Sequence, residues 1–142
     1  MVCVNQEEAI KDADVVFAAL PHGLSEPLAK VCVEKDILFI DLGADFRLES
    51  EEEYKEWYNK SYDCPEIHDL AVYCIPELFR EKVTGKKIIA NPGCYPTSCA
   101  LGLTPVLEKG YVECNHVIID SKSGVTGAGR GLSQTTHYPD CN

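Results

Sequence analysis

One segment of the sequence combines a nucleophilic side chain with a rigid backbone frame, Asn91-Pro92-Gly93-Cys94-Tyr95-Pro96-Thr97. Apolar residues 88–90 precede it, and a long apolar stretch, 98–107, follows it. This order predicts a buried strand, a tight turn and a helix whose first turn carries the thiol of Cys94. A thiol there lies at the positive end of the helix dipole, which favours the thiolate. Thiolates are nucleophiles in covalent acyl chemistry, so we predict that Cys94 is a catalytic nucleophile.

The sequence contains eight cysteines in 142 residues. In a secreted protein this even number would indicate disulfides, but the N-terminal residues lack the plan of a signal peptide. No Cys-x-x-Cys pair occurs, so we expect no structural zinc site and no other metal. We expect every cysteine except Cys94 to be a reduced thiol, packed mostly as a small apolar side chain. The alternative that Cys94 is also only a packed thiol stays open.

Length and charge limit the classes of partner. A chain of 142 residues is long enough for one domain with a hydrophobic core. The net charge of −10 argues against binding to nucleic acids or to anionic membranes. No apolar run reaches the length of a membrane span. We therefore expect a globular, cytoplasmic protein that binds neither nucleic acids nor membranes.

The elements around Cys94 predict a parallel sheet. The apolar run 14–20 is typical of a strand buried on both faces, and 37–41 predicts a second strand. Between them, Ser25 begins a helical pattern and can cap it. Alternating strands and helices favour a parallel sheet, whose carboxyl edge is where ligands bind. Three polar or glycine-rich strand ends converge on this edge: 21–23, 41–47 and 91–94.

The remaining segments complete an α/β pattern. We predict a helix within 49–58, an irregular surface excursion over 59–69, a short strand at 72–75 and a short helix at 77–83. We also predict a strand at 117–120. It runs into the loop 121–131, which is rich in glycine and hydroxyl groups and contains an arginine. Such loops allow the backbone to approach an anionic ligand closely.

Single charged residues give weaker signals. Arg47 follows a strand end and suits either a surface ion pair or bidentate binding of a phosphate or carboxylate. Asp41 and Asp120 end strands and are either strand terminators or site residues. None of the four histidines has a spacing that marks it as the base for Cys94, and we expect each to be structural or at the surface: His22, His68, His116 and His137.

Five segments in this order resemble the N-acetyl-gamma-glutamyl-phosphate reductases, NADPH-dependent enzymes of arginine biosynthesis: 18–23, 41–47, 73–78, 91–97 and 120–130. The resemblance implies a partial Rossmann-like parallel sheet followed by the start of an α+β catalytic and dimerisation domain. We expect an NADP-binding part over 1–112, which includes the Cys94 helix, and the second domain over 113–142. The parent enzyme would be a homo-oligomer, a dimer or a tetramer.

The resemblance also implies roles for particular residues. Cys94 would attack an acyl phosphate to form a thioester, which NADPH reduces to the semialdehyde. Arg47 would hold the substrate phosphate, and Arg130 would be a second anion contact. Residues matching the cofactor contacts are Pro21, His22, Gly23, Ser123, Gly124, Gly127 and Gly129.

Two departures from the family pattern are evident. No Gly-x-x-Gly-x-x-Gly phosphate loop precedes Asp14, and no His-x-Pro-Glu segment with the family's acid–base histidine occurs. We therefore expect an internal fragment of the enzyme that is inactive alone. Two alternatives remain: a fragment of an aspartate-semialdehyde dehydrogenase-type reductase, or a non-enzymatic assembly module that recruits another chain through an exposed sheet edge.

Overall fold

The structure is a computed structural model that describes residues 5–129, 131, 133–137 and 139. The chain forms two compact units, Met1–Pro105 and Val106–Asn142. No helix in the described part is long and apolar enough to cross a membrane.

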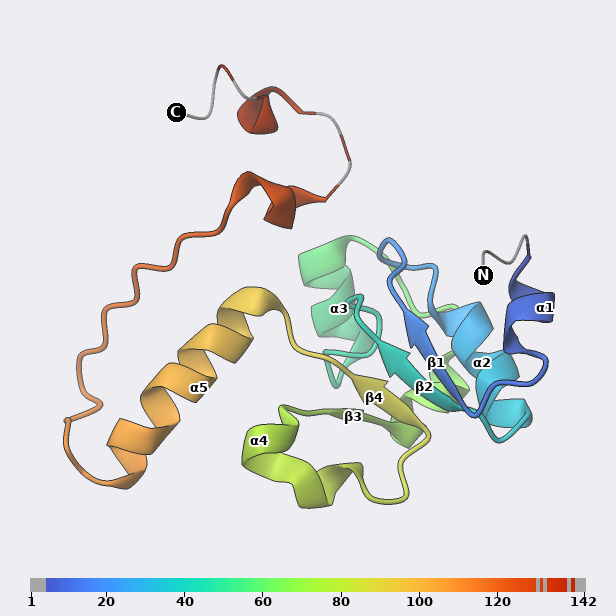
Figure 1. The fold of residues 1–142 in the computed structure, drawn as a ribbon, viewed down its shortest axis with the longest axis horizontal. Helices are drawn as coiled ribbons and strands as arrows, with labels where there is room; N and C mark the ends of the chain where they lie inside the picture. Colours follow the sequence, from blue (N-terminus) through green and yellow to red (C-terminus); the bar gives the residue numbers. More distant parts are fainter. Residues whose placement is uncertain (1–4, 130, 132, 138, 140–142) are drawn as a thin grey trace. The chain divides into compact units, whose positions relative to one another are not determined.

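The first unit is built on a four-stranded parallel sheet (Figure 1). Its strands are β1 (Val15–Ala18), β2 (Leu38–Asp41), β3 (Ala71–Tyr73) and β4 (Ile88–Ala90), in the order β1-β2-β4-β3. Val15 pairs with Leu38, and Ile88 lies between Phe39 and Ala71. The prediction of a partial Rossmann-like parallel sheet is confirmed.

Helices connect these strands and extend beyond them. The first unit contains α1 (Gln6–Ile10), α2 (Glu26–Glu34), α3 (Glu51–Tyr58), the 3₁₀ helix η1 (Pro65–Leu70), α4 (Pro76–Phe79) and η2 (Arg80–Val83). Helix α5 (Cys94–Glu108) follows β4, and the second unit adds the 3₁₀ turns η3 (Val125–Ala128) and η4 (Gln134–Thr136). In Figure 1, α3 lies beyond the carboxyl ends of β1 and β2.

Local sequence explains where two of the helices begin and end. The hydroxyl of Ser50 accepts a hydrogen bond from the amide of Glu53, which caps the start of α3. Three glutamates in the first turn of α3 also face the positive end of its dipole. At the end of α5, Gly110 adopts the left-handed φ of 66° and donates its amide to the carbonyl of Leu107.

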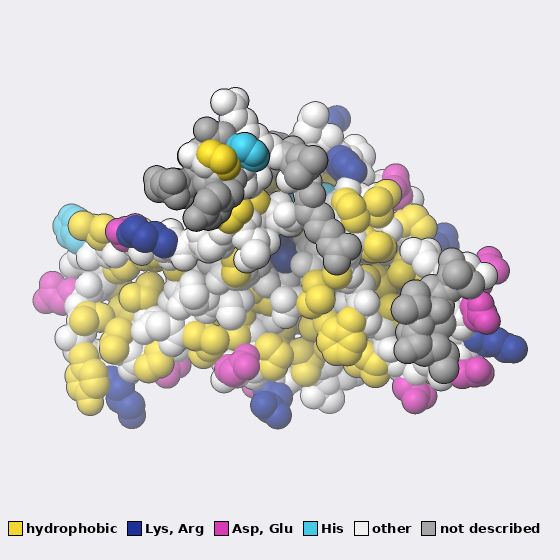
Figure 2. Space-filling model, turned by 45° about the horizontal axis from the view of Figure 1, so that its top comes forward, with side chains coloured by type: hydrophobic (Ala, Val, Ile, Leu, Met, Phe, Trp, Pro, Cys, Tyr) yellow, Lys and Arg dark blue, Asp and Glu magenta, His cyan; other side chains and the backbone are white. Residues whose placement is uncertain are grey.

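The hydrophobic core lies against one face of the sheet. Its buried members come from α1, α2, β1, β2, β4 and η1, with neighbouring loop residues: Ile10, Ala18, Ala29, Cys32, Ile37, Phe39, Phe46, Cys64, Ile67, Ile88 and Ala90. The prediction that β1 is buried on both faces is wrong, because Val15 is 41% and Phe17 67% exposed. Side chains alternate between the faces of a strand, and the core takes only one face of β1. Apolar side chains reach the surface over much of the view in Figure 2.

Segment 59–69 is more than a surface excursion, so this prediction is wrong in part. Cys64 and Ile67 belong to the core, and η1 carries Ile67 into it. The Tyr62 ring stacks on the ring of His68 with centroids 3.5 Å apart. The sequence pattern missed this burial because the apolar residues are too sparse to show a period.

The second unit also differs from one expectation. Residues 117–120, predicted as a strand, form no strand in the described part of the chain. Ile118 is 96% exposed, so its side chain is not held by packing. An apolar run becomes a strand only where a neighbouring strand accepts its backbone hydrogen bonds.

Candidate active site

Cys94 lies where β4 passes into α5. The strand ends at Ala90, the turn 91–93 follows, and α5 begins at Cys94, as the motif predicted. The amide of Asn91 donates to the carbonyl of Asp41 (2.8 Å), which continues the ladder between β4 and β2 into the turn. The amide of Thr97 donates to the carbonyl of Gly93 (3.0 Å), which forms the first turn of the helix. The thiol of Cys94 is exposed and can be reached by a ligand.

Arg47 lies beside this turn. Its Nε donates to the carbonyl of Asn91 (2.9 Å), and its Nη2 donates to the carbonyl of Leu42 (3.0 Å). A Cβ atom placed on Gly93 would lie 3.3 Å from Nη1 of Arg47. The structure therefore brings together the predicted nucleophile's turn and the predicted anion-binding arginine from a distant part of the sequence.

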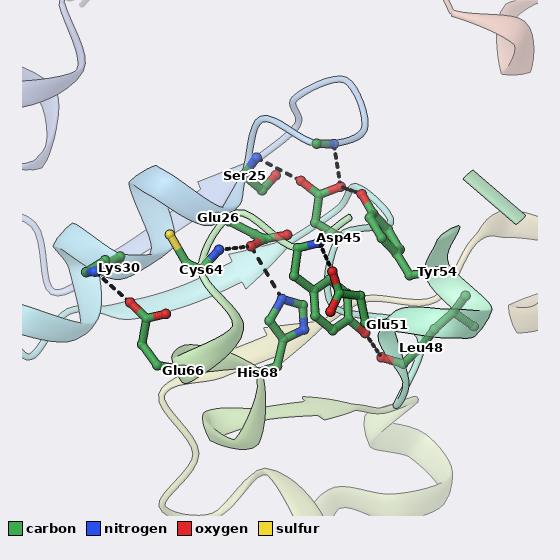
Figure 3. Close-up of polar contacts among 12 residues, drawn as sticks. Ser25, Glu26, Lys30, Asp45, Leu48, Glu51, Tyr54, Cys64, Glu66 and His68 are labelled. Carbon is green, nitrogen blue, oxygen red and sulfur yellow. Dashed lines mark hydrogen bonds and ion pairs between the residues drawn. The ribbon is translucent and has the colours of Figure 1, made fainter. Parts of the chain in front are cut away.

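The predicted cofactor turn, 21–23, follows β1 at the same edge of the sheet. Pro21 and His22 are exposed, and Gly23 has a φ of 80°, which favours glycine. The Asp45 carboxylate holds this turn, accepting hydrogen bonds from the amides of Gly23 (2.7 Å) and Ser25 (2.8 Å). Figure 3 shows the contact between Ser25 and Asp45. The turn thus has a defined shape while its outer residues stay open to a ligand.

Tyr54 completes the environment of Asp45. Its hydroxyl donates to Oδ1 of Asp45 (2.8 Å), and both side chains are fully buried (Figure 3). Burial, followed by the hydrogen bond to Asp45, raises the pKa of Tyr54. Tyr54 therefore stays a protonated donor well into the alkaline range. Asp45 accepts three hydrogen bonds in all, two of them from the cofactor-turn region.

Asp41, at the end of β2, is the second buried aspartate of this network. Its Oδ1 accepts hydrogen bonds from the hydroxyl of Ser25 (2.9 Å) and the amide of Gly43 (3.0 Å). Its Oδ2 has no hydrogen-bond partner among the described residues. Burial raises the pKa of Asp41, although the hydrogen bonds from Ser25 and Gly43 act in the opposite direction. Asp41 thus ends β2 and holds Ser25 and Gly43 through its carboxylate.

The contact of Ser25 with Asp41 corrects one expectation. Ser25 lies at the N-cap position of α2, but its side chain makes no capping hydrogen bond. Its hydroxyl donates a hydrogen bond to the buried carboxylate of Asp41 instead. A cap pattern in sequence cannot reveal such a competitor from a distant strand.

His68 is partly buried and packs beside a third carboxylate, that of Glu26. The Nε2 atom of His68 lies 3.5 Å from Oε2 of Glu26, which also accepts a hydrogen bond from the amide of Cys64 (2.5 Å; Figure 3). The ring of His68 also lies against Phe46, with centroids 4.8 Å apart. The packing of His68 against Phe46 and Glu26 fits the expectation that this histidine is structural.

Sequence reasoning missed three of these polar residues, namely Glu26, Asp45 and Tyr54. Charged residues are seldom fully buried, so a sequence pattern predicts Glu26 and Asp45 at the surface. The burial of Tyr54 depends on its contact with Asp45, which the sequence does not show. Asp45 alone gave a weak signal, since it follows the same strand end as Asp41 and Arg47.

The other cysteines fit the expectation of packed thiols only in part. Cys32, Cys64 and Cys74 are buried, and burial raises the pKa of each thiol. Cys114 is a free thiol but is exposed, so it is an exception to the packing expected for most of these cysteines. It lies in a part of the second unit that supplies no core around it. Two further cysteines, Cys3 and Cys141, lie outside the described residues.

A cavity of about 810 Å³ lies next to Arg47 in the first unit. Pro96, two residues after Cys94, also lines it, together with Lys82. Glu49 and Asp69 balance the two basic side chains. The cavity is large enough for a small, charged metabolite, and Cys94 is not among its lining residues.

The glycine-rich loop lies in the second unit. Ser123 and Gly124 precede η3, Gly127 lies within it, and Gly129 ends it with a φ of 81°. A Cβ on Gly127 would lie 2.4 Å from Oγ of Ser123, so only glycine fits there without rearrangement. All four residues are exposed. Arg130, the predicted second anion contact, lies outside the described residues.

Comparison with known proteins covers the whole chain. A family model described as semialdehyde dehydrogenase, NAD binding domain, matches residues 1–86, and one described as semialdehyde dehydrogenase, dimerisation domain, matches residues 94–142. The chain is 52% identical over 142 residues to an N-acetyl-gamma-glutamyl-phosphate reductase of Clostridium botulinum. It is 50% identical over 142 residues to that of Clostridium beijerinckii and 51% identical over 146 residues to that of Brachyspira hyodysenteriae.

These matches include 98–100% of the chain but only 41–42% of each relative. The five sequence motifs predicted a resemblance to the N-acetyl-gamma-glutamyl-phosphate reductases, and these matches confirm it.

Proposed function

Because this chain belongs to the semialdehyde dehydrogenase family, we propose that it carries the nucleophile of an NADPH-dependent reductase that converts N-acetyl-glutamyl 5-phosphate to N-acetyl-glutamate 5-semialdehyde and phosphate. The observation that carries the proposal is the exposed thiol of Cys94 at the start of α5, with the guanidinium of Arg47 against the preceding turn. A nucleophile that follows a turn in contact with a cation suits a substrate that is both an acyl donor and an anion.

The first chemical step belongs to Cys94. Its thiolate sulfur attacks the acyl carbon of the substrate, and a carbon–sulfur bond forms. The carbon–oxygen bond to the phosphate then breaks, and the phosphate leaves with the bonding electron pair. The product of this step is a thioester on Cys94. Cys94 is the first residue of α5 and is exposed, so its sulfur can reach the acyl carbon of a substrate.

Arg47 would bind the leaving phosphate. Nε and one N–H of Nη2 are engaged with carbonyl groups, which leaves the N–H groups of Nη1 and the second one of Nη2 for phosphate oxygens. A charge-assisted hydrogen bond from these groups strengthens as charge develops on the phosphate. Arg130 remains a proposed second contact.

The residues at the carboxyl edge fit a nicotinamide dinucleotide. Pro21 and His22 are open to solvent, while buried Asp45 fixes the backbone of Gly23 from below. We assign the cofactor contacts to this turn and to the loop residues Ser123, Gly124, Gly127 and Gly129. When bound, NADPH supplies the hydride that brings the thioester to the oxidation level of an aldehyde.

Assembly is part of the same proposal. The match to a dimerisation domain over residues 94–142 supports a homo-oligomeric enzyme, a dimer or a tetramer. A sedimentation experiment on the protein would check this.

Alkylation combined with substrate protection tests the function. The chain is treated with a low dose of iodoacetamide, and the rates at Cys94 and the exposed Cys114 are compared by mass spectrometry. We expect Cys94 to react first and N-acetyl-glutamyl 5-phosphate to protect it, while Cys114 reacts at the same rate with or without substrate. Equal rates at the two thiols, or no protection, would contradict the proposal.

The same assay separates the two substrate classes. β-Aspartyl phosphate has the same acyl phosphate group on a shorter chain without an N-acetyl group. Better protection by β-aspartyl phosphate would favour an aspartate-semialdehyde dehydrogenase-type reductase instead. Inorganic phosphate serves as the control for binding of the anion alone.

A further inference from the structure

We infer that Arg47 is a positioning residue for the turn that carries Cys94, in addition to any contact that it makes with the substrate phosphate. The inference rests on the proposed function, because the position of the turn matters only if Cys94 is the nucleophile. It starts from the hydrogen bonds that Arg47 already makes within the chain.

Both backbone polar groups of Asn91 are bound to one segment. Its amide donates to the carbonyl of Asp41 (2.8 Å), and its carbonyl accepts from Nε of Arg47 (2.9 Å). Asp41 is the last residue of β2, and Arg47 lies at the end of the segment 42–47 that follows it. The first residue of the turn is therefore fixed from both sides before the chain reaches Cys94.

The guanidinium also limits the space at Gly93. A Cβ on Gly93 would lie 3.3 Å from Nη1 and 3.9 Å from Cζ of Arg47, and 3.5 Å from Cδ of Pro96. The carbonyl of Gly93 accepts the first hydrogen bond of α5, from the amide of Thr97. The guanidinium thus lies against Gly93, the residue directly before Cys94 and the start of α5.

The segment that carries Arg47 is itself held firmly. Nη2 of Arg47 donates back to the carbonyl of Leu42, which closes the segment on itself. Asp45 and Phe46 within it are buried, and Asp45 accepts three hydrogen bonds. Because this segment is well held, the hydrogen bond from Arg47 to Asn91 fixes the turn relative to it. A side chain on a mobile loop could not fix the turn in this way.

Lysine cannot replace this arrangement. The planar guanidinium reaches the carbonyls of Asn91 and Leu42 at once from two different nitrogens. A lysine keeps the positive charge but has a single nitrogen on a flexible stem. Arg47→Lys therefore separates positioning from charge, while Arg47→Gln removes both.

The test compares these two variants with Arg80→Lys, a control at an exposed arginine of η2. The first readout is the ratio of the alkylation rates of Cys94 and Cys114. The second is the hydrogen-exchange rate of the Thr97 amide by NMR, which depends on the first turn of α5 and not on thiol chemistry.

We expect both Arg47 variants to lower the Cys94 to Cys114 ratio by about two- to fivefold, the size of the helix-dipole effect lost from a badly placed thiol. Exchange of the Thr97 amide should become faster in both variants, and Arg80→Lys should behave as the parent. A merely destabilising change would lower the melting temperature without changing the ratio.

Two results would overturn the inference. If Arg47→Lys keeps the parent ratio and the parent exchange rate, charge alone is the task of Arg47. If both Arg47 variants keep the parent exchange rate at Thr97, the turn does not depend on this side chain. Failure of the proposed function is distinct, since it shows as absence of substrate protection at Cys94 in the parent, and the Thr97 readout still decides the role of Arg47.

Discussion

The buried carboxylates of Asp41 and Asp45 differ in how many of their oxygens accept hydrogen bonds. Asp45 has both oxygens occupied by donors, whereas Asp41 has one oxygen without a partner among the described residues. A buried charge is stable only where hydrogen bonds replace the lost water. The two residues should therefore respond in opposite ways to the same substitution.

Asp45→Asn should destabilise the chain. An amide nitrogen would face the backbone N–H of either Gly23 or Ser25, so at least one buried donor loses its acceptor. We expect a loss of about 1–3 kcal/mol in the free energy of unfolding. Urea unfolding followed by fluorescence measures it. Stability equal to that of the parent would show that the carboxylate does not hold the turn.

Asp41→Asn should leave the chain as stable as the parent at pH 7, or make it more stable. Burial raises the pKa of Asp41 in the folded state above its unfolded value of about 3.9, so the folded chain binds a proton more tightly. This contribution to stability is present below the unfolded pKa and is lost as pH rises through the raised folded pKa.

Asparagine avoids that loss, because its oxygen still accepts from Ser25 and Gly43 while the side chain stays neutral. Urea unfolding of both proteins from pH 3 to pH 8 checks the prediction. The stability curves should separate as pH rises, with the variant above. A variant that is less stable than the parent at pH 7 would mean that the ionised carboxylate is needed.

At the residue scale, the sequence predicted which residues lie at the candidate site better than which residues support it. Cys94 and Arg47 could be proposed because a motif frame and a strand end marked them, and the structure brings Arg47 to the turn before Cys94. Asp45 was missed as the centre of the network because its partners lie 9, 20 and 22 residues away, on different elements. Such partners become neighbours only after the strands are paired.

At the scale of elements, α5 is the segment on which the thiol depends. It is apolar along its length, and none of its described side chains is buried within the chain. A helix that is apolar all round is normally covered on several sides. Substitutions that change only the backbone preference of α5 can therefore be tested with few packing changes within the described part of the chain.

Two glycines of this region give a matched prediction. Gly102 lies inside α5, and a Cβ at this position would meet open space, so Gly102→Ala should increase helix stability by about 0.5–1 kcal/mol. Gly110 has a φ of 66°, so Gly110→Ala should fray the end of the helix. Far-UV circular dichroism should show more helix in the first variant and less in the second. The reverse order would contradict the helix boundaries.

The order of elements in the first unit could be predicted from sequence because its strands are short apolar runs separated by turn signals. The sequence could not show that β1 is covered on one face only, since an apolar run is the same whether one or both faces pack. The expected strand at 117–120 failed for a related reason, because apolar character does not supply the partner strand.

At the scale of the whole molecule, the residues proposed for substrate and cofactor come from two compact units of the chain. The thiol, Arg47 and the cofactor turn belong to the first unit, and the glycine-rich loop belongs to the second. The chain spans about two fifths of the length of the relatives that it matches. Acyl transfer to the thiol needs only the proposed nucleophile and the anion-binding arginine. It is therefore the step of the proposed reaction that is most suitable for a test with this chain.

The most direct test of the proposed function is therefore to look for the thioester. The chain is incubated with N-acetyl-glutamyl 5-phosphate without cofactor, and intact mass, peptide mapping and released phosphate are measured. We predict one N-acetyl-glutamyl group on Cys94 with an equal amount of phosphate released, and neither product from Cys94→Ser. Phosphate release without a modified Cys94, or the same acylation of Cys114 as of Cys94, would contradict the role of Cys94 as the nucleophile.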